Sequence, residues 1–217
     1  MTDAINHTRI APTPSGFLHV GNILSFAITS ALAQKNTAKV LLRIDDLDQA
    51  RANEQYIPLD TENAAWRLTT GNKELAIRNY NGEIIYAALP PDMQNFVIRR
   101  RDGIPAYQLA SVVDDLHYNI DLVVRGEDLW SSTIAQHELA LALGESSFSR
   151  IKFYHHPLLM EASGQKLSKS AGSTSVKYLR GHGKSPSDIY TMIGKMAGIE
   201  QEINNWNELM VAVDLLI

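Results

Sequence analysis

The 217-residue sequence contains no cysteine and no long hydrophobic run. Without cysteine, this sequence can form neither disulfides nor metal sites built on thiolates. No apolar segment approaches the roughly 20 residues that cross a bilayer, and the N-terminus lacks a secretory pattern, so we expect a cytoplasmic protein without a membrane segment. Positive charge is not in surplus either, because the formal net charge is −4. This balance argues against a general nucleic-acid coat and leaves only local patches for RNA.

One stretch near the C-terminal end could provide such a patch. Between Glu161 and Asp188 the sequence has no acidic residue. It has five cationic residues there, namely Lys166, Lys169, Lys177, Arg180 and Lys184. We therefore treat this stretch as the candidate RNA contact, while the 45% hydrophobic content is enough for an ordinary folded core.

The segment RIAPTPSGFLHVGN, Arg9 to Asn22, joins a short β-run to the start of an apolar helical pattern. A strand that turns sharply into a helix leaves the first backbone N–H groups of the helix available for phosphate. Gly16 and Gly21 would let a ligand approach the backbone, and His19 can donate hydrogen bonds to phosphate oxygens. Alone, the pattern H-x-G-N is weak evidence, because a single histidine near a helix start is usually an ordinary surface or core residue.

The second segment of interest is KLSKS, Lys166 to Ser170, which by itself is most simply a solvated lysine loop. Together the two segments suggest adenylate formation, since negative charge builds on the leaving pyrophosphate and cations stabilise it. They resemble the two signature motifs of the class I aminoacyl-tRNA synthetases. Arg9 and the segments RIDDLD, IRRRDGIPAY and VVRGEDL resemble the glutamyl branch of that family, in the right order over most of the chain.

The fold that we expect is α/β, with a doubly wound, Rossmann-like and mainly parallel sheet and with C-terminal helices. The expected strands are buried ones at 39–44, 120–124 and 151–155 and a hairpin at 72–89 that turns at Asn81-Gly82. The expected helices lie at 107–116, 132–143, 186–197 and 203–216, with Ser132 and Ser185 as the caps of the second and third. The first of these helices is expected to bury Leu109, Ala110, Val112 and Val113. The resemblance implies a single catalytic domain over 1–217, with halves 1–57 and 62–170, a helical part 171–217, and no anticodon-binding domain.

The junction between Ile57 and Pro58 is unusual for this family. Its flanks resemble segments normally separated by an insertion that grips the acceptor end of tRNA and in some members holds zinc. Either the insertion is absent, or the intact polypeptide has residues that this sequence lacks, and zinc would be expected only there. The helix from Ala52 would be too short before Pro58 to be stable, and no turn-forming repair flanks the junction, which favours the second explanation.

The resemblance also implies roles for individual residues. Glutamate binding would fall to Arg9, Ala11, Thr13, Asp45, Tyr107 and Arg125. ATP binding would fall to His19, Gly21, Asn22 and Lys169, with Mg²⁺ accompanying ATP, and catalysis to His19, Asn22, Lys166 and Lys169. Arg9 would pair with the side-chain carboxylate of glutamate, and Asp45 would hold its ammonium group. Asp45 stands where the family normally has glutamate, so the amino-acid specificity is open at this position.

The leading hypothesis is therefore an ATP-dependent ligase that activates glutamate as its adenylate and transfers it to tRNA. Because an anticodon-binding domain is not evident, the chain resembles the short glutamyl-queuosine tRNA(Asp) synthetases, with tRNA(Asp) carrying queuosine as partner and a monomeric state. The alternatives are the catalytic part of a glutamyl-tRNA synthetase, a non-catalytic paralogue that binds an amino acid or RNA, and a nucleotidyltransferase with a similar H-x-G-H turn.

Overall fold

The computed structural model describes residues 4–12, 17–43, 64–159 and 175–217. Several expectations lie outside these ranges: those for Gly16, Thr13, Asp45, Lys166 and Lys169, and those for the helix from Ala52 and the junction of Ile57 with Pro58.

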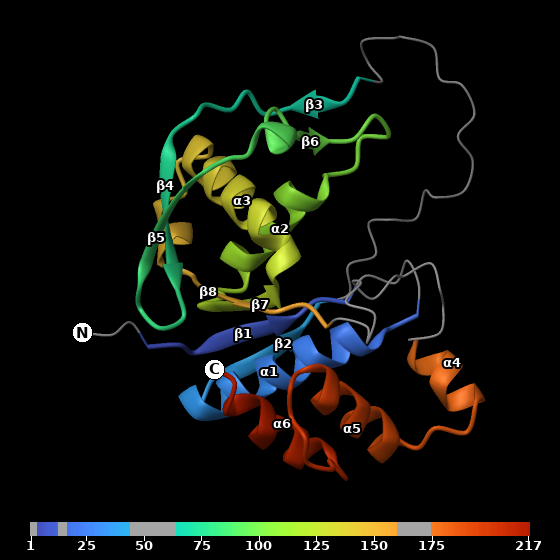
Figure 1. Cartoon of the computed structure of the whole chain (residues 1–217). Helices are drawn as coiled ribbons and strands as arrows, with labels where there is room; N and C mark the ends of the chain where they lie inside the picture. The colour runs from blue at the N-terminus through green and yellow to red at the C-terminus, as the bar shows by residue number, and fades with distance from the viewer. Residues whose placement is uncertain (1–3, 13–16, 44–63, 160–174) are drawn as a thin grey trace.

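The centre of the molecule is a six-stranded sheet in the order β2-β1-β7-β8-β4-β5 (Figure 1). Its strands are β1 (His7–Ile10), β2 (Lys39–Leu42), β4 (Glu74–Asn79), β5 (Ile84–Ala88), β7 (Leu122–Gly126) and β8 (Lys152–His156). All neighbouring pairs are parallel except the hairpin of β4 and β5. The expected mainly parallel sheet is thus confirmed, and the hairpin extends the sheet because β4 pairs with β8.

Helices cover both faces of this sheet (Figure 1). One face carries α1 (Val20–Asn36), α5 (Pro186–Met196) and α6 (Trp206–Asp214), and the other carries α2 (Tyr107–His117) and α3 (Trp130–Ala142). The remaining elements are α4 (Val176–Gly181), the short helices η2 (Pro91–Met93), η3 (Glu127–Leu129) and η4 (Ser146–Arg150), and the antiparallel pair of β3 (Trp66–Arg67) with β6 (Val97–Arg99). This layering is that of a doubly wound α/β fold.

Two hydrophobic clusters hold the layers together, one on each face. Strand β7 serves both, because successive side chains of a strand point to opposite faces. Leu122 and Val124 pack with α1, α5 and α6, whereas Val123 packs with α2 and α3. The sheet is therefore buried on both sides where β7 and β8 run, as expected for central parallel strands.

Local start and stop signals place several elements where the sequence predicts them. Ser185 caps α5, its hydroxyl accepting from the Asp188 N–H, and the Asp188 carboxylate accepts in return from Ser185. Gly82 in the β4–β5 turn has a φ of +91°, a conformation that favours glycine. Gly144, with a φ of +77°, follows the end of α3 as a C-terminal cap residue.

Three expectations about burial and boundaries were wrong. Strand β2 is not buried: Leu42 is 69% exposed, because β2 pairs with β1 alone and forms an edge of the sheet. In α2, Val112 is buried as expected, but Val113 is half exposed and Leu109 and Ala110 are only partly buried. The buried face carries in addition the polar residues Gln108, Ser111 and Asp115. Helix α3 begins at Trp130 directly after η3, so Ser132 lies inside its first turn and accepts a hydrogen bond from Gln108.

No helix within the described ranges has both the length and the apolar character needed to cross a membrane.

Candidate active site

The first turn of α1 is closed by the residues expected to bind ATP. His19 is the N-cap, and its Nδ1 accepts a hydrogen bond of 3.1 Å from the Gly21 N–H. Asn22 completes a capping box with His19, because the Asn22 Oδ1 accepts a hydrogen bond of 3.1 Å from the His19 N–H. Since Nδ1 is an acceptor, the proton of a neutral His19 ring is on Nε2, which makes Nε2–H a donor at the start of the helix.

The structure gives Gly21 a role that the sequence did not reveal. A Cβ atom at this position would lie 2.9 Å from Cε1 and 3.0 Å from Nδ1 of His19. Any larger residue would therefore push the imidazole ring out of its capping position. Glycine is required here for the ring of His19, in addition to any approach by a ligand.

The chain that returns from the KLSKS segment docks beside this turn. Ser175 forms an isolated antiparallel bridge with His19, and the Val176 N–H donates to the Leu18 carbonyl at 2.8 Å. These are the first described residues after Ser170. The bridge ties the two motif regions together through residues that adjoin each of them.

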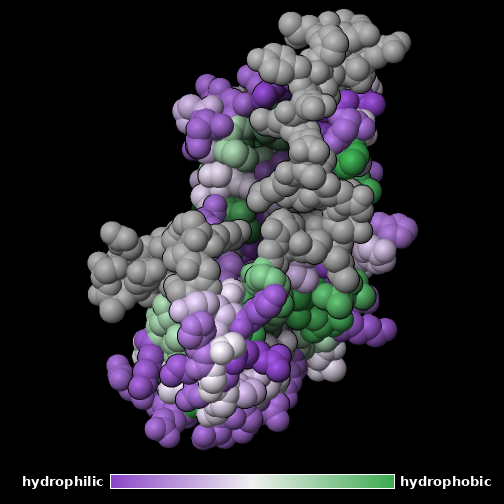
Figure 2. Space-filling view, turned by 90° about the vertical axis from the view of Figure 1, so that its right-hand side faces the viewer, coloured by the Kyte–Doolittle hydropathy of each residue, from purple (hydrophilic) through white to green (hydrophobic). Residues whose placement is uncertain are grey.

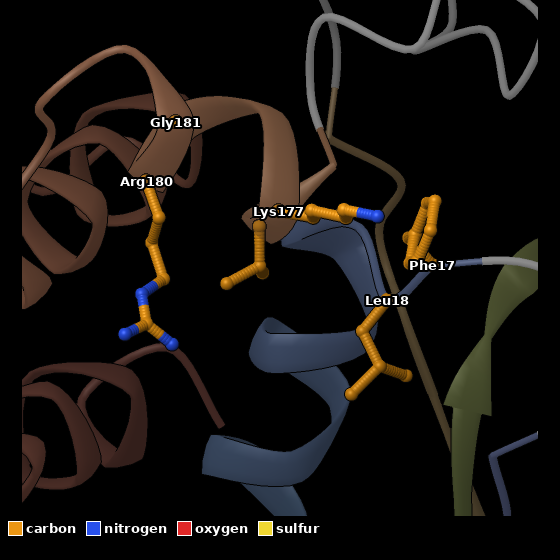
Figure 3. Close-up of a pocket in the computed structure, with 6 residues that line it drawn as sticks. Phe17, Leu18, Lys177, Arg180 and Gly181 are labelled. Atoms are coloured by element: carbon orange, nitrogen blue, oxygen red, sulfur yellow. The ribbon is translucent and has the colours of Figure 1, made fainter.

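A groove lies next to the bridge between His19 and Ser175 (Figure 3). It is lined by Phe17, Leu18, Val176, Lys177, Arg180 and Gly181. The Lys177 ammonium stands 4.2 Å from the centroid of the Phe17 ring, which is 64% exposed. This side of the molecule has hydrophobic surface next to hydrophilic surface (Figure 2). One cation of the acid-free stretch, Lys177, thus contacts an exposed aromatic side chain, and a second, Arg180, lines the same groove.

On the other face of the sheet, Arg9 of β1 is held by a partner that sequence reasoning missed. Its Nε and Nη2 donate to the two carboxylate oxygens of Asp115 at 2.6 and 3.1 Å, and both side chains are buried. Arg43, just after β2, approaches the same carboxylate at 3.5 Å and donates to Ser111 at 3.3 Å. The signal for Asp115 in the sequence was an acidic residue on the inward stripe of α2, three to four residues from Ser111 and Val112.

Arg125, at the end of β7, is the second buried arginine of this face. Its Nη2 donates to Thr133 Oγ1 and, at 3.0 Å, to Gln136 Oε1, both on α3. Its guanidinium also lies 5.0 Å from the centroid of Phe153. The Nε and Nη1 atoms are buried and have no hydrogen bond of good geometry in the described part of the chain.

Burial lowers the pKa of Arg125 to about 10, with the charge of Arg9 acting in the same direction. The nearby Tyr107 hydroxyl and Asp115 oppose this shift in pKa. Arg125 therefore stays protonated at neutral pH. Arg9 and Tyr107, which are far from Arg125 in sequence, both lie within electrostatic reach of it, and Ala11 follows directly after β1.

Two histidines, the buried His137 and the half-buried His155, lie next to the Thr133 partner of Arg125, and sequence reasoning missed both. The Nε2 atom of His155 lies 2.7 Å from Thr133 Oγ1, and Nδ1 of His137 lies 2.8 Å from the Thr133 carbonyl. Burial, reinforced by the charge of Arg125, lowers the pKa of His155 to about 3. Burial likewise lowers the pKa of His137 to about 4, against the bond to Thr133. Both rings are therefore neutral at pH 7.

The chain matches the family model described as "tRNA synthetases class I (E and Q), catalytic domain" over residues 6–87 and 73–214. A glutamyl-Q tRNA(Asp) synthetase of Synechococcus sp. (strain CC9605) is 31% identical, over 87% of this chain and 81% of its own length. That alignment runs over 243 positions, more than the 217 residues of this chain, so the relative has residues that this chain lacks.

Longer relatives match as well. The glutamate–tRNA ligase 1 of Sulfurimonas denitrificans is 26% identical over 95% of this chain, which spans 62% of the ligase. A crystal structure of the glutamate-tRNA synthetase of Elizabethkingia anophelis superimposes with a TM-score of 0.68, at 16% identity, covering 95% of this chain and 65% of that one. This likeness shows a shared fold. By its family match and its relatives, the chain belongs to the class I tRNA synthetases of the E and Q type, within their catalytic domain.

Proposed function

We propose that this chain activates glutamate with ATP as glutamyl-adenylate and transfers the glutamyl group to tRNA. The observation that carries the proposal is the buried pair of Arg9 and Arg125, near the C-terminal ends of the neighbouring strands β1 and β7, in a chain whose α1 begins with the His19 cap. A pocket with fixed guanidinium groups suits an amino acid with two carboxylates. A helix N-terminus with a donor imidazole suits a triphosphate.

On the amino-acid side, Arg9 would bind the side-chain carboxylate, with its orientation set by the bidentate pair to Asp115. Arg125 would offer Nε and Nη1, which are buried donors without a hydrogen bond of good geometry among the described residues, with the Tyr107 hydroxyl nearby. A buried unpaired donor costs about 1–3 kcal/mol, so a ligand carboxylate at these atoms would be favoured. Tyr107, Ala11 and Thr13 would complete the pocket, and Asp45 would hold the ammonium group.

On the nucleotide side, His19 Nε2 and the first turn of α1, with Gly21 and Asn22, would bind the phosphates of ATP. The carboxylate of glutamate itself attacks the α-phosphate, so the protein needs no nucleophile, and pyrophosphate leaves. Lys166 and Lys169 would stabilise the charge that builds on the leaving group, with Mg²⁺ bound to ATP. Ser175, five residues after Ser170 in the sequence, forms a bridge with His19 in this turn. That His19 and Lys169 share one cleft stays a prediction.

For the acceptor, we favour tRNA(Asp) with queuosine, because the Synechococcus relative bears that name and this chain spans most of its length. The groove of Phe17, Lys177 and Arg180 would contact the RNA, since cations and an exposed aromatic ring suit phosphates and bases. The alternative is the catalytic part of a glutamyl-tRNA synthetase, which the match to the longer ligases supports.

The test is glutamate-dependent exchange of pyrophosphate into ATP, measured with and without tRNA. We expect exchange with glutamate, and transfer of labelled glutamate to tRNA(Asp) that carries queuosine but not to tRNA(Asp) that lacks it. The Lys169→Ala variant, as the control, should slow exchange at least about 100-fold while glutamate binding is retained. Binding of glutamate or RNA without any exchange would instead identify a non-catalytic paralogue.

A further inference from the structure

Two consecutive histidines, His155 and His156, end strand β8 beside the end of β7. In the register of these parallel strands, His155 is paired with Arg125 and His156 with Gly126. Successive side chains of a strand point to opposite faces. The first histidine therefore faces α2 and α3 with Arg125, and the second faces α1.

His155 reaches Arg125 through one hydroxyl group. Its Nε2 lies 2.7 Å from Thr133 Oγ1, and the same oxygen accepts from Arg125 Nη2. The hydroxyl proton can go to His155 or to the Leu129 carbonyl at 3.2 Å, and in either arrangement the oxygen accepts from Arg125. The ring of His155 is itself fixed by Phe153, stacked at 6.2 Å, and by Trp130, edge-on at 5.0 Å. Arg125, Thr133 and His155 thus form a chain of three hydrogen-bonded side chains.

His156 makes a corresponding contact on the other face. Its Nδ1 lies 2.9 Å from the Pro157 carbonyl, so Nδ1 carries the proton and Nε2 is the acceptor. Nε2 lies 2.6 Å from Ser25 Oγ, on the second turn of α1. The single hydroxyl proton of Ser25 can go to His156 Nε2 or to the Gly21 carbonyl, which lies 3.1 Å away in the turn that His19 caps. The end of β8 is thereby joined to the first turns of α1.

We propose that these tandem histidines are positioning residues for the two halves of the active site: His155 orients Arg125 through Thr133, and His156 sets the position of His19 and the start of α1 through Ser25. This inference rests on the proposed function, because it assigns the Arg125 half to glutamate and the α1 half to ATP. The end of one strand would then fix the position of the amino-acid site relative to the nucleotide site. Adenylate formation requires this, because its two reacting groups must meet.

The experiment compares variants of the two faces in pyrophosphate exchange, with the KM for glutamate and the KM for ATP measured separately. His155→Phe keeps the ring contacts and removes the bond to Thr133, and Thr133→Val removes the same bond from the other side. We expect each to raise the KM for glutamate about tenfold, the effect of about 1.4 kcal/mol for one hydrogen bond, with the KM for ATP within about twofold of wild type. Thr133→Ser, which keeps the hydroxyl, should restore the KM for glutamate.

His156→Phe and the smaller change Ser25→Ala should do the reverse, raising the KM for ATP about tenfold and leaving the KM for glutamate within about twofold. Thr29→Val is the matched control, because Thr29 is a buried threonine of α1 whose hydroxyl bonds only within the helix, to the Ser25 carbonyl at 2.7 Å. Both KM values of this control should stay at wild-type levels. Thermal unfolding verifies that each variant is folded. If a histidine variant does not fold, the KM values of Thr133→Val and Ser25→Ala test the inference in its place.

An active wild type whose two sets of variants change both KM values together, or neither of them, would overturn the inference and leave the proposed function standing. A wild type without glutamate-dependent exchange would overturn the proposed function and the inference with it. The split between the two KM values is the result that a merely structural role for these histidines would not produce.

Discussion

Each face of the central sheet has a hydrophobic cluster, but the two faces differ in the buried charge that they carry. The face under α2 and α3 buries Arg9, Arg125 and Asp115 together with polar residues of α3. The face under α1, α5 and α6 is largely apolar, with Leu32, Ile193 and Leu209 fully buried. Burying charge costs free energy unless each charge is paired, whereas apolar burial stabilises the fold. We infer that burial of apolar side chains on both faces stabilises the fold, and that the buried charges of the polar face lower stability in return for a fixed ligand site.

The largest expected effect comes from removing the charge of the polar face. Arg125→Leu should lower kcat/KM for glutamate about a thousandfold, or ~4 kcal/mol, because two charge-assisted hydrogen bonds to the ligand are lost. The free energy of unfolding should stay the same or rise, since an apolar side chain then replaces a buried cation. Pyrophosphate exchange and urea unfolding measure the two effects. Arg150→Leu, at an exposed site on η4, is the control that should change neither. A large loss of stability in Arg125→Leu would remove the contrast between the faces.

The apolar face should respond in the opposite way. Leu209→Ala, at a fully buried position of α6, should lower the free energy of unfolding by about 2–5 kcal/mol through lost burial and a cavity. Both KM values should remain those of the wild type under conditions where the protein is folded. The same substitution at Leu215, which is 81% exposed, is the matched control and should change stability by less than about 0.5 kcal/mol. If Leu209→Ala raised the KM for glutamate instead, the assignment of the glutamate site to the face under α2 and α3 alone would be wrong.

The smallest effect concerns the neutral histidines of the polar face. Folding lowers the pKa of His155 to about 3 and that of His137 to about 4, below the ordinary value of 6.5. The unfolded chain therefore binds more protons in the interval below pH 6.5, and stability falls as the pH drops through it, while it is flat above. Between pH 6.5 and 5.5 each ring should cost about 1 kcal/mol.

Urea unfolding at pH 7.5, 6.5 and 5.5 measures this slope. His155→Phe should reduce the loss of stability between pH 6.5 and 5.5 by about 1 kcal/mol, the contribution of one ring. Equal slopes in the wild type and in His155→Phe would mean that His155 is not held neutral by the fold.

Much of the fold could be predicted because its signals are local. The Ser185-Pro186 start of α5 and the Asn81-Gly82 turn depend on backbone preferences of a few neighbouring residues. The segments around His19 and Lys166 were recognised for the same reason, since each is contiguous in sequence. Arg9, Tyr107 and Arg125 were named from short segments too, and the structure then places Arg9 and Tyr107 within electrostatic reach of Arg125.

The remaining features depend on which elements become neighbours, and a one-dimensional pattern does not carry that information. Strand β2 has the composition of a buried strand, but the strand order makes it an edge. Asp115 is a partner of Arg9 across 106 residues of sequence, and only the packing of α2 against β1 joins them. His155 and His156 are adjacent in sequence and serve opposite faces, because the pleat of β8 separates them and α1 and α3 supply their partners. Local chemistry determined the elements and the motifs of this protein, and long-range packing decided which charges and rings meet.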